Sequence, residues 1–415
     1  MAHILLLDVP GGNDFSVLDD AVRDGHEVTF YTSDLAHYRR QGEITELALT
    51  LARKIIEIRP FDYPTFEHNA LEVHRENPFD AILCLIDIRL VEASRLAEKL
   101  GLRFLNLTTA RLLRDKFSVR EVLAKRGVRQ PRFALAKTVD ELRQAVTEIG
   151  YPALVKPSDG YGSQNVSVLF TEKNLDVLAA SFLQTTLNPT DYGFGVCANN
   201  RFSIEQYISG SMIGCDVFSD NRARTFLGIN HKLMFAPPSF AMRGSCFPSD
   251  CFNNSAIRDY AFEILDAVNF DFGAAHIEMI VADDGPYLVE VNPRLVSAQI
   301  PYQMGYALER SVYVDLINLH LGSPLPDLPD ITPRWFSVIR WITARHPGIL
   351  DRVRLPQHAD PRIRRVALFK EQGDTVRPPI SNGDRIGYVI AVGKTRGAAE
   401  QLADGYVRDT LVELR

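Results

Sequence analysis

Apolar and polar positions alternate most regularly between Ala275 and Arg294, which predicts two short strands joined by a tight turn. Successive side chains of a strand point to opposite faces, so every second residue shares a side. One face of the first strand should therefore be polar, and the other should be apolar and buried. The residues expected on the polar faces are His276, Glu278 and Ile280 in the first strand and Leu288, Glu290 and Asn292 in the second.

The turn of this hairpin fixes which residues face each other. Asp283–Gly285 reads as a three-residue loop, with Gly285 suited to the left-handed conformation. Ala282 should then pair with Pro286, and counting back places Glu278 opposite Glu290. Two carboxylates that face each other repel, and a cation between them relieves the repulsion.

The polar face also carries Asn292, and Glu278, Glu290 and Asn292 together offer oxygen ligands only. Oxygen donors suit Mg²⁺ rather than zinc. The sequence therefore predicts a magnesium site formed by Glu278, Glu290 and Asn292. The plain alternative is an ordinary hairpin whose acidic side chains are solvated.

The pattern of the first hundred residues predicts a parallel sheet covered by helices. A strand, a loop, a helix and a second strand occur in order and then recur, which is typical of α/β units. The Pro10–Asn13 loop lacks the glycine spacing of a dinucleotide site, so it is expected to line a substrate pocket at the strand ends. The elements expected here are strands at 3–9, 27–32, 81–85 and 103–105 and helices at 15–23 and 90–100.

A second unit should begin near Thr108 with a helix over 111–125 that contains Lys116. The strand 153–157 carries Lys156 and leads into the glycine-rich loop 158–162. A lysine beside bare backbone N–H groups is a phosphate cradle. A plain hairpin with a glycine turn is the alternative.

Composition narrows the class of protein. The 415 residues are 46% apolar and 24% charged with a net charge of -6, which suits two to four packed units and does not suggest nucleic acid as a partner. Five cysteines without a CxxC pair indicate a reducing cytoplasm. No apolar run reaches membrane-spanning length, so no membrane contact is expected.

The order of these motifs resembles the ATP-grasp superfamily. The motifs are Asp115-Lys116, Lys156 with its glycine loop, Glu205-Gln-Tyr-Ile208, Glu278 and Glu290-x-Asn292-x-Arg294. The segments GAAHIEM, GPYLVEVNPR and NGDRIGYVIAVGKT are most similar to the L-amino acid ligase branch, which includes dipeptide synthetases.

The resemblance implies a multidomain fold of α/β and α+β units. A Rossmann-like domain would span residues 1–107, and the ATP-grasp fold would consist of two α+β subdomains at 108–204 and 205–322. A small α+β domain would occupy 323–415, after a proline-dense linker at 323–333.

The resemblance also implies a role for each site residue. ATP would be bound by Lys116, Lys156, Gly160, Gly162, Ser163, Glu205, Gln206, Tyr207 and Ile208. Mg²⁺, as two ions, with Mn²⁺ as an alternative metal, would be bound by Glu278, Glu290 and Asn292. Arg294 would be catalytic, and the substrate would meet Arg243, His276 and Ser297.

Three positions depart from the family pattern. Met212 stands where many relatives carry an acidic residue for the ribose, and Asp216 is a substitute candidate. Leu295–Ser297 replaces a common Gly-Gly and should reshape the acceptor pocket. Arg243 stands where relatives carry Glu-x-Gly, which makes it a candidate clamp for a substrate carboxylate, or else a solvated loop arginine.

The activity that the resemblance implies is an ATP-dependent carboxylate–amine ligase. An acyl phosphate would form and be attacked by an amine, with release of ADP and phosphate, and one substrate would be an amino acid. The partners would be small molecules, and a homodimer is left open. The alternatives are a carboxylase-type or purine-pathway enzyme and a nucleotide-binding regulator without catalysis.

Overall fold

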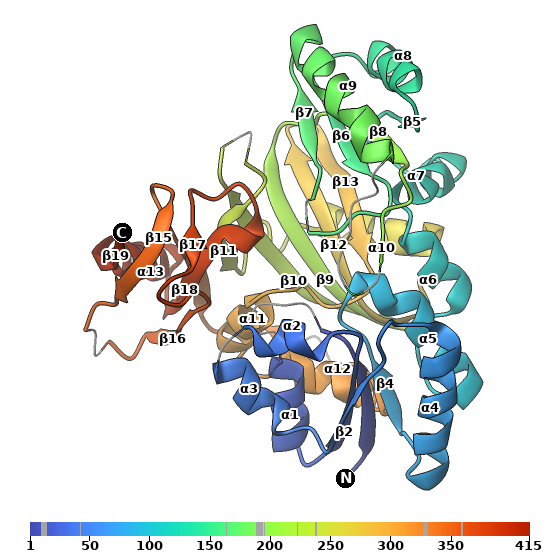
Figure 1. Cartoon of the computed structure of the whole chain (residues 1–415), viewed down its shortest axis with the longest axis vertical. Helices are drawn as coiled ribbons and strands as arrows, with labels where there is room; N and C mark the ends of the chain where they lie inside the picture. Colours follow the sequence, from blue (N-terminus) through green and yellow to red (C-terminus); the bar gives the residue numbers. More distant parts are fainter. Residues whose placement is uncertain are drawn as a thin grey trace.

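The computed structural model describes residues 1–9, 15–41, 43–162, 164–187, 194, 196–221, 223–236, 239–326, 331–357 and 360–415. The predicted loop Pro10–Asn13, Ser163 and residues 327–330 of the predicted linker lie outside these ranges. The described residues form four β-sheets (Figure 1). The fold class is the expected one, a mixed α/β multidomain protein with a parallel N-terminal sheet.

The N-terminal unit is a parallel sheet in the order β3-β2-β1-β4. Helices cover both faces, because β1, β2 and β4 are buried on both sides and need apolar cover. The expected strand at 103–105 is wrong, since these residues have no ladder partner. The elements are β1 (His3–Leu7), α1 (Ser16–Arg23), β2 (Glu27–Thr32), α2 (Leu35–Arg39), α3 (Glu43–Leu49), β3 (Lys54–Glu57), α4 (Tyr63–Glu76), β4 (Ala81–Leu83), η1 (Asp87–Arg89) and α5 (Leu90–Leu100).

The second unit is an antiparallel sheet in the order β5-β8-β6-β7, preceded by two short helices. The single helix expected over 111–125 is wrong, because Asp115 leaves the helical conformation and caps a new helix through Ser118 N. Lys116 is therefore the first residue of that helix. The elements are α6 (Leu107–Leu113), α7 (Lys116–Lys125), β5 (Phe133–Ala136), α8 (Val139–Ile149), β6 (Ala153–Pro157), β7 (Ser167–Leu169), α9 (Glu172–Leu187) and β8 (Phe202–Gln206).

An eight-stranded sheet in the order β13-β12-β9-β10-β11-β14-β18-β16 runs through the middle of the molecule (Figure 1). Its β11 contains Arg243, for which a solvated loop was one expectation, and the pairing of β11 with β14 carries the sheet into the C-terminal unit. The predicted division after residue 322 is therefore crossed by this sheet. The strands are β9 (Ser211–Asp220), β10 (Ala223–Met234), β11 (Met242–Phe247), β12 (Phe272–Ala282), β13 (Gly285–Asn292), β14 (Phe336–Thr343), β16 (Ile363–Leu368) and β18 (Arg385–Gly393).

The two faces of this sheet have different neighbours. Helix α10 (Ser255–Ala267) covers the face that buries Ile277 and Met279, as the alternation predicted. The opposite face packs, at one end, against α11 (Ile300–Leu308), α12 (Val312–His320) and the N-terminal unit (Figure 1). His276 and Glu278 belong to this second face, further along β12.

The C-terminal unit completes the molecule. Helix α13 (Arg396–Asp409) packs on β14 and β18, and a small sheet in the order β17-β15-β19 lies beside them. Its strands are β15 (Gly348–Arg354), β17 (Thr375–Val376) and β19 (Leu411–Leu414), and η3 (Asn382–Asp384) precedes β18. None of the helices that the structure describes is both long and apolar enough to cross a lipid bilayer.

Candidate active site

The hairpin β12–β13 places Glu278 opposite Glu290, as the sequence predicted, although its loop is different. Ala282 pairs with Gly285 rather than with Pro286, so the turn has two residues instead of three. A β-bulge at Val289 adds one residue and restores the expected register at Glu290.

The bulge also corrects one expectation about the faces of β13. Leu288 does not share the face of Glu290 but is buried with Val291 against α10. The extra residue, Val289, turns its carbonyl oxygen toward the neighbouring subdomain, where it accepts hydrogen bonds from Lys156 Nζ at 3.1 Å and Arg120 Nη2 at 3.1 Å. The bulge thus connects the hairpin to the lysine strand.

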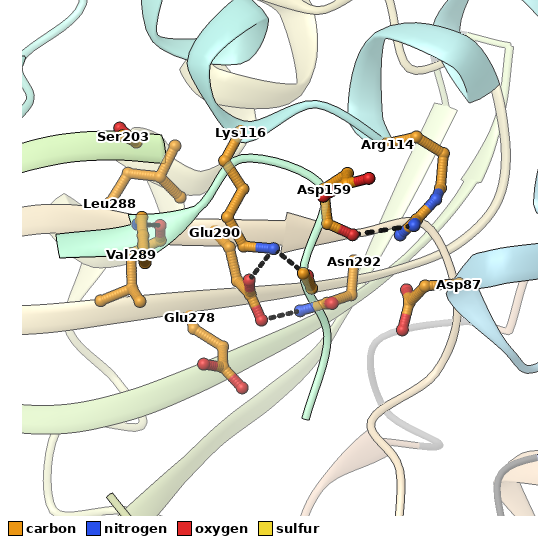
Figure 2. A network of polar contacts seen from close by, with 12 residues as sticks. Asp87, Arg114, Lys116, Asp159, Ser203, Glu278, Leu288, Val289, Glu290 and Asn292 are labelled. Atoms are coloured by element: carbon orange, nitrogen blue, oxygen red, sulfur yellow. Dashed lines mark hydrogen bonds and ion pairs between the residues drawn. The ribbon is translucent and has the colours of Figure 1, made fainter. Parts of the chain in front are cut away.

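Lys116 reaches the hairpin from the N-terminus of α7 (Figure 2). Its Nζ lies 3.0 Å from Glu290 Oε2, and it also donates to the carbonyl of Gly160. Asn292 Nδ2 donates to the other oxygen, Glu290 Oε1, at 3.3 Å. Glu278 lies on the adjacent strand below Glu290 in Figure 2. The lysine, the glycine loop and two of the predicted metal ligands are therefore brought together.

Glu278 belongs to a second charged group on the same face. Lys232 Nζ of β10 forms an ion pair with Glu278 and lies 2.9 Å from His276 Nε2. Burial would raise the pKa of Glu278, but Lys232 and His276 outweigh burial and hold that pKa below its ordinary value. Glu278 therefore keeps its charge, as a metal ligand must.

Asp216 anchors this group and does not serve the ribose. Its side chain is fully buried and accepts from His276 Nδ1 at 3.1 Å, from Asn230 Nδ2 at 3.2 Å and from the backbone N of Val296 at 3.1 Å. The expectation that Asp216 replaces a ribose-binding acid is wrong, because it is fully buried beside His276 on the neighbouring strand and its oxygens already accept these hydrogen bonds. Asp216 instead contacts Nδ1 of His276, on the side of the ring away from Lys232, and so orients the ring.

The side chain of Glu205 lies in a buried cluster with Lys156 and Arg120. Arg120 donates to both carboxylate oxygens, at 3.2 and 2.8 Å, and Lys156 Nζ lies 3.0 Å from Oε2. Burial lowers the pKa of the Lys156 ammonium, and Glu205 opposes that change. Arg120 was not predicted, although it follows Lys116 by one helical turn and so shares its face of α7.

This cluster gives a prediction about stability. Burial alone would raise the pKa of Glu205, but Arg120 and Lys156 lower it to about 2 from 4.5. A carboxylate with a lowered folded-state pKa stabilises the fold above its unfolded-state pKa, and this contribution of about 3 kcal/mol disappears as the pH falls from about 5 to 2. Glu205→Gln should cost about 3–5 kcal/mol at pH 7, because it leaves two buried cations without their carboxylate.

Urea unfolding of both proteins at pH 7 and near pH 3 checks this prediction. The difference in free energy of unfolding between parent and variant should shrink at the lower pH. If the difference in free energy of unfolding is equal at both pH values, Glu205 does not contribute to stability through its charge.

A cavity of about 460 Å³ lies between the two subdomains, next to these charged groups. The predicted ATP-binding residues Glu205, Gln206, Tyr207 and Ile208 line it, and so do Gly160 and Gly162. It is lined at its base by the predicted phosphate and metal residues Lys116, Lys156, Glu278 and Glu290. The structure thus collects nearly all predicted nucleotide residues around one cavity of ligand size.

The other predicted substrate residues are divided. His276, Arg294 and Ser297 line a second, smaller cavity beside Glu278. Arg294 donates two hydrogen bonds to Asp87 Oδ2 of η1, at 2.9 and 2.6 Å, and one to Asn292 Oδ1 at 3.3 Å. Arg243 is exposed on β11 and lines neither cavity, because the alternation of that strand turns Met242 inward instead. The clamp expected of Arg243 is not supported.

The donor set fits a magnesium ion better than a softer metal. Within the described ranges no three His, Cys, Asp or Glu side chains gather into a metal cluster. Glu278, Glu290 and Asn292 offer two carboxylates and one amide, and Mg²⁺ is usually bound by one or two carboxylates together with substrate phosphates. Each carboxylate already has a lysine partner, so the charge of the face is balanced before a cation arrives.

Comparison with known proteins agrees with this geometry. The ATP-grasp domain family matches residues 113–298, and the family described as L-amino acid ligase C-terminal domain 2 matches residues 340–415. The crystal structure of an L-amino acid ligase from Bacillus licheniformis is similar with a TM-score of 0.83 at 19% identity, over 100% of this chain and 99% of that one.

Other relatives share the fold. Phosphoribosylglycinamide synthetase from Anaerococcus prevotii gives a TM-score of 0.73 at 18% identity, over 100% of both chains. The biotin carboxylase domain of Hydrogenobacter thermophilus 2-oxoglutarate carboxylase gives a TM-score of 0.74 at 18% identity, over 100% of this chain and 91% of that one. An uncharacterized Sinorhizobium fredii protein, y4rH, is 29% identical over 301 residues, which are 69% of this chain and only 58% of that protein.

The chain therefore contains a match to the ATP-grasp domain over residues 113–298, followed by a match to an L-amino acid ligase C-terminal domain over residues 340–415. Enzymes with the ATP-grasp domain generally use ATP and Mg²⁺.

Proposed function

We propose that this protein is an ATP-dependent ligase that joins the carboxylate of one small molecule to the amine of another, with an amino acid as one substrate. The observation that supports this most is the position of Arg294. It lies beyond the metal carboxylates, in the wall of the second cavity, where a protein that only binds nucleotide would need no cation. The C-terminal domain match favours the amino acid ligase type over other ATP-grasp chemistry.

The reaction has two balanced steps. A carboxylate oxygen bonds to the γ-phosphorus of ATP, the bond between that phosphorus and the bridging oxygen breaks, and ADP leaves. The amine nitrogen then bonds to the acyl carbon, the bond from that carbon to the phosphate oxygen breaks, and the nitrogen loses a proton. The products are an amide, ADP and phosphate, and no nucleophilic side chain is required.

The side chains of this protein bind and orient the reacting groups. Lys116 and Lys156 would neutralise phosphate oxygens, and the backbone of Gln206–Ile208 would meet the adenine. Arg294 would stabilise the negative charge that develops on the acyl oxygens during amine attack. These roles follow from the residues that line the first cavity and from the position of Arg294 beside it.

Glu278, Glu290 and Asn292 would hold Mg²⁺, as two ions. A bound magnesium ion neutralises charge on the phosphates during transfer. Lys232 and Lys116, which pair with the two carboxylates, also line the nucleotide cavity, so they would turn toward the phosphates once their carboxylates hold Mg²⁺.

Product analysis tests the proposed function. Pairs of standard amino acids are incubated with ATP and Mg²⁺, and phosphate, ADP and AMP are measured. We expect phosphate and ADP to appear only with a correct pair, together with a new amide product. Release of AMP and pyrophosphate would contradict the acyl phosphate, because it would mean that an adenylate forms instead. Phosphate release that requires bicarbonate and no amino acid would favour the carboxylase-type alternative.

A further inference from the structure

The second cavity, of about 90 Å³, adjoins the nucleotide cavity along a shared wall. Met212, Lys232, Met234, Phe240 and Glu278 line both cavities. A molecule in the second cavity would therefore have one end beside the metal carboxylates, where an acyl phosphate would form. The second cavity is thus placed to hold the molecule that attacks.

Its far wall comes from the C-terminal unit. Arg385, the first residue of β18, and Asn382 of η3 both line it. The Arg385 guanidinium carbon lies 3.9 Å from the centre of the Trp341 ring, and Nη2 donates to Asn382 Oδ1. Asn382 Oδ1 also accepts from the backbone N of Met242 at 3.0 Å. The guanidinium, whose residue is only 7% exposed, is held in one position by a ring and an amide.

The remaining walls are mostly apolar, and the space is small. A cavity of about 150 Å³ can hold one benzene molecule, so about 90 Å³ suits a molecule of a few heavy atoms. The apolar lining consists of Met212, Met234, Phe240, Met242, Val296 and Ile300.

We propose that this cavity binds the amine substrate, and that this substrate is a small α-amino acid whose carboxylate is bound by Arg385. The proposal rests on the ligase function proposed above. The activated carboxylate must lie beside Glu278 and Glu290, whereas Arg385 does not line the nucleotide cavity at all. The anion that Arg385 binds is therefore a second carboxylate, and a planar guanidinium matches it in a two-point contact.

Acid and amide forms of one acceptor test the proposal. After the donor screen, ligation is measured with glycine and alanine and with glycinamide and alaninamide as acceptors. The parent protein should prefer the acid over the amide by a factor on the order of 10² in kcat/KM, because an amide cannot make the charged two-point contact with the guanidinium that a carboxylate makes. Arg385→Gln should raise the acceptor KM by a similar factor, remove that preference and leave the KM values of ATP and the donor unchanged.

Arg352→Gln on β15 is the matched control, since this arginine is exposed in the same unit and lines neither cavity. It should behave like the parent. Arg385→Lys keeps the charge without the fork and should recover part of the preference for the acid.

Three results would overturn the assignment. They are a parent protein that uses glycinamide as well as glycine, an Arg385→Gln variant that keeps the preference, or a variant in which the donor KM rises instead of the acceptor KM. If no pair of amino acids releases phosphate, the proposed function fails first, so the two failures can be told apart.

Discussion

Glu290→Gln is expected to lower turnover by a factor on the order of 10² or more, with little change in stability. The change preserves shape but removes one of the two carboxylate charges that face each other on β12 and β13. The ion pair of Glu290 with Lys116 is partly exposed, at 23% and 17%, so its loss should cost at most about 1 kcal/mol. Turnover should therefore fall strongly, whereas the melting temperature should change little.

Turnover as a function of Mg²⁺ concentration, together with thermal unfolding, checks this expectation. The variant should need more Mg²⁺ and should stay slow even at saturation. Glu98→Gln on the exposed side of α5 is the control and should match the parent. A near-normal rate of the Glu290 variant at saturating Mg²⁺ would show that the hairpin does not hold the metal.

Arg294→Lys is expected to bind ATP about as well as the parent and to lose a factor of roughly 10² to 10³ in ligation rate, the usual effect of removing one oxyanion donor. The guanidinium contacts Asp87, Asn292 and the carbonyl of Leu295 at the same time. A lysine has a single nitrogen and cannot keep these contacts while it also reaches two substrate oxygens. ATP affinity by calorimetry and ligation rate at saturating substrates measure the two effects.

The ion pair between Arg294 and Asp87 offers a competing explanation, in which the arginine only fastens η1 to the strand end. Asp87→Asn separates the two, because it weakens the same contact and leaves the arginine in place. If the ion pair is only structural, Asp87→Asn and Arg294→Lys should lower the melting temperature by similar amounts and reduce the ligation rate by similar factors. If Arg294 is catalytic, Arg294→Lys should ligate much more slowly than Asp87→Asn at equal stability.

The hairpin shows what local pattern can predict. The period of two in β12 correctly separated Ile277 and Met279, which are buried under α10, from Glu278 on the site face. The same count chose the wrong loop, and the pairing of Glu278 with Glu290 survived only because a bulge at Val289 added the missing residue. A bulge has no signal in the alternation itself, since its position is set by what Leu288 and Val289 contact elsewhere.

The charge partners show what local pattern could not predict. The sequence suggested two lysines for phosphates and two glutamates for a metal, and the structure pairs Lys116 with Glu290 across subdomains. It also placed Asp216 near the ribose, where the structure instead buries it behind His276. Such pairings join residues that are far apart in the chain, so they depend on how the subdomains pack.

The amino-acid sequence by itself predicted the mixed α/β class, most strands and helices of the N-terminal unit and the hairpin with its facing glutamates, because these depend on local periodicity. The resemblance of its motifs to ATP-grasp enzymes supplied the expected nucleotide and metal residues. Only the tertiary structure decided that β11 extends the central sheet into the C-terminal unit and that Arg385 lies in the wall of the second cavity while Arg243 faces solvent. The physical reason is that strand pairing and the direction of a side chain across a sheet are fixed by contacts between distant segments.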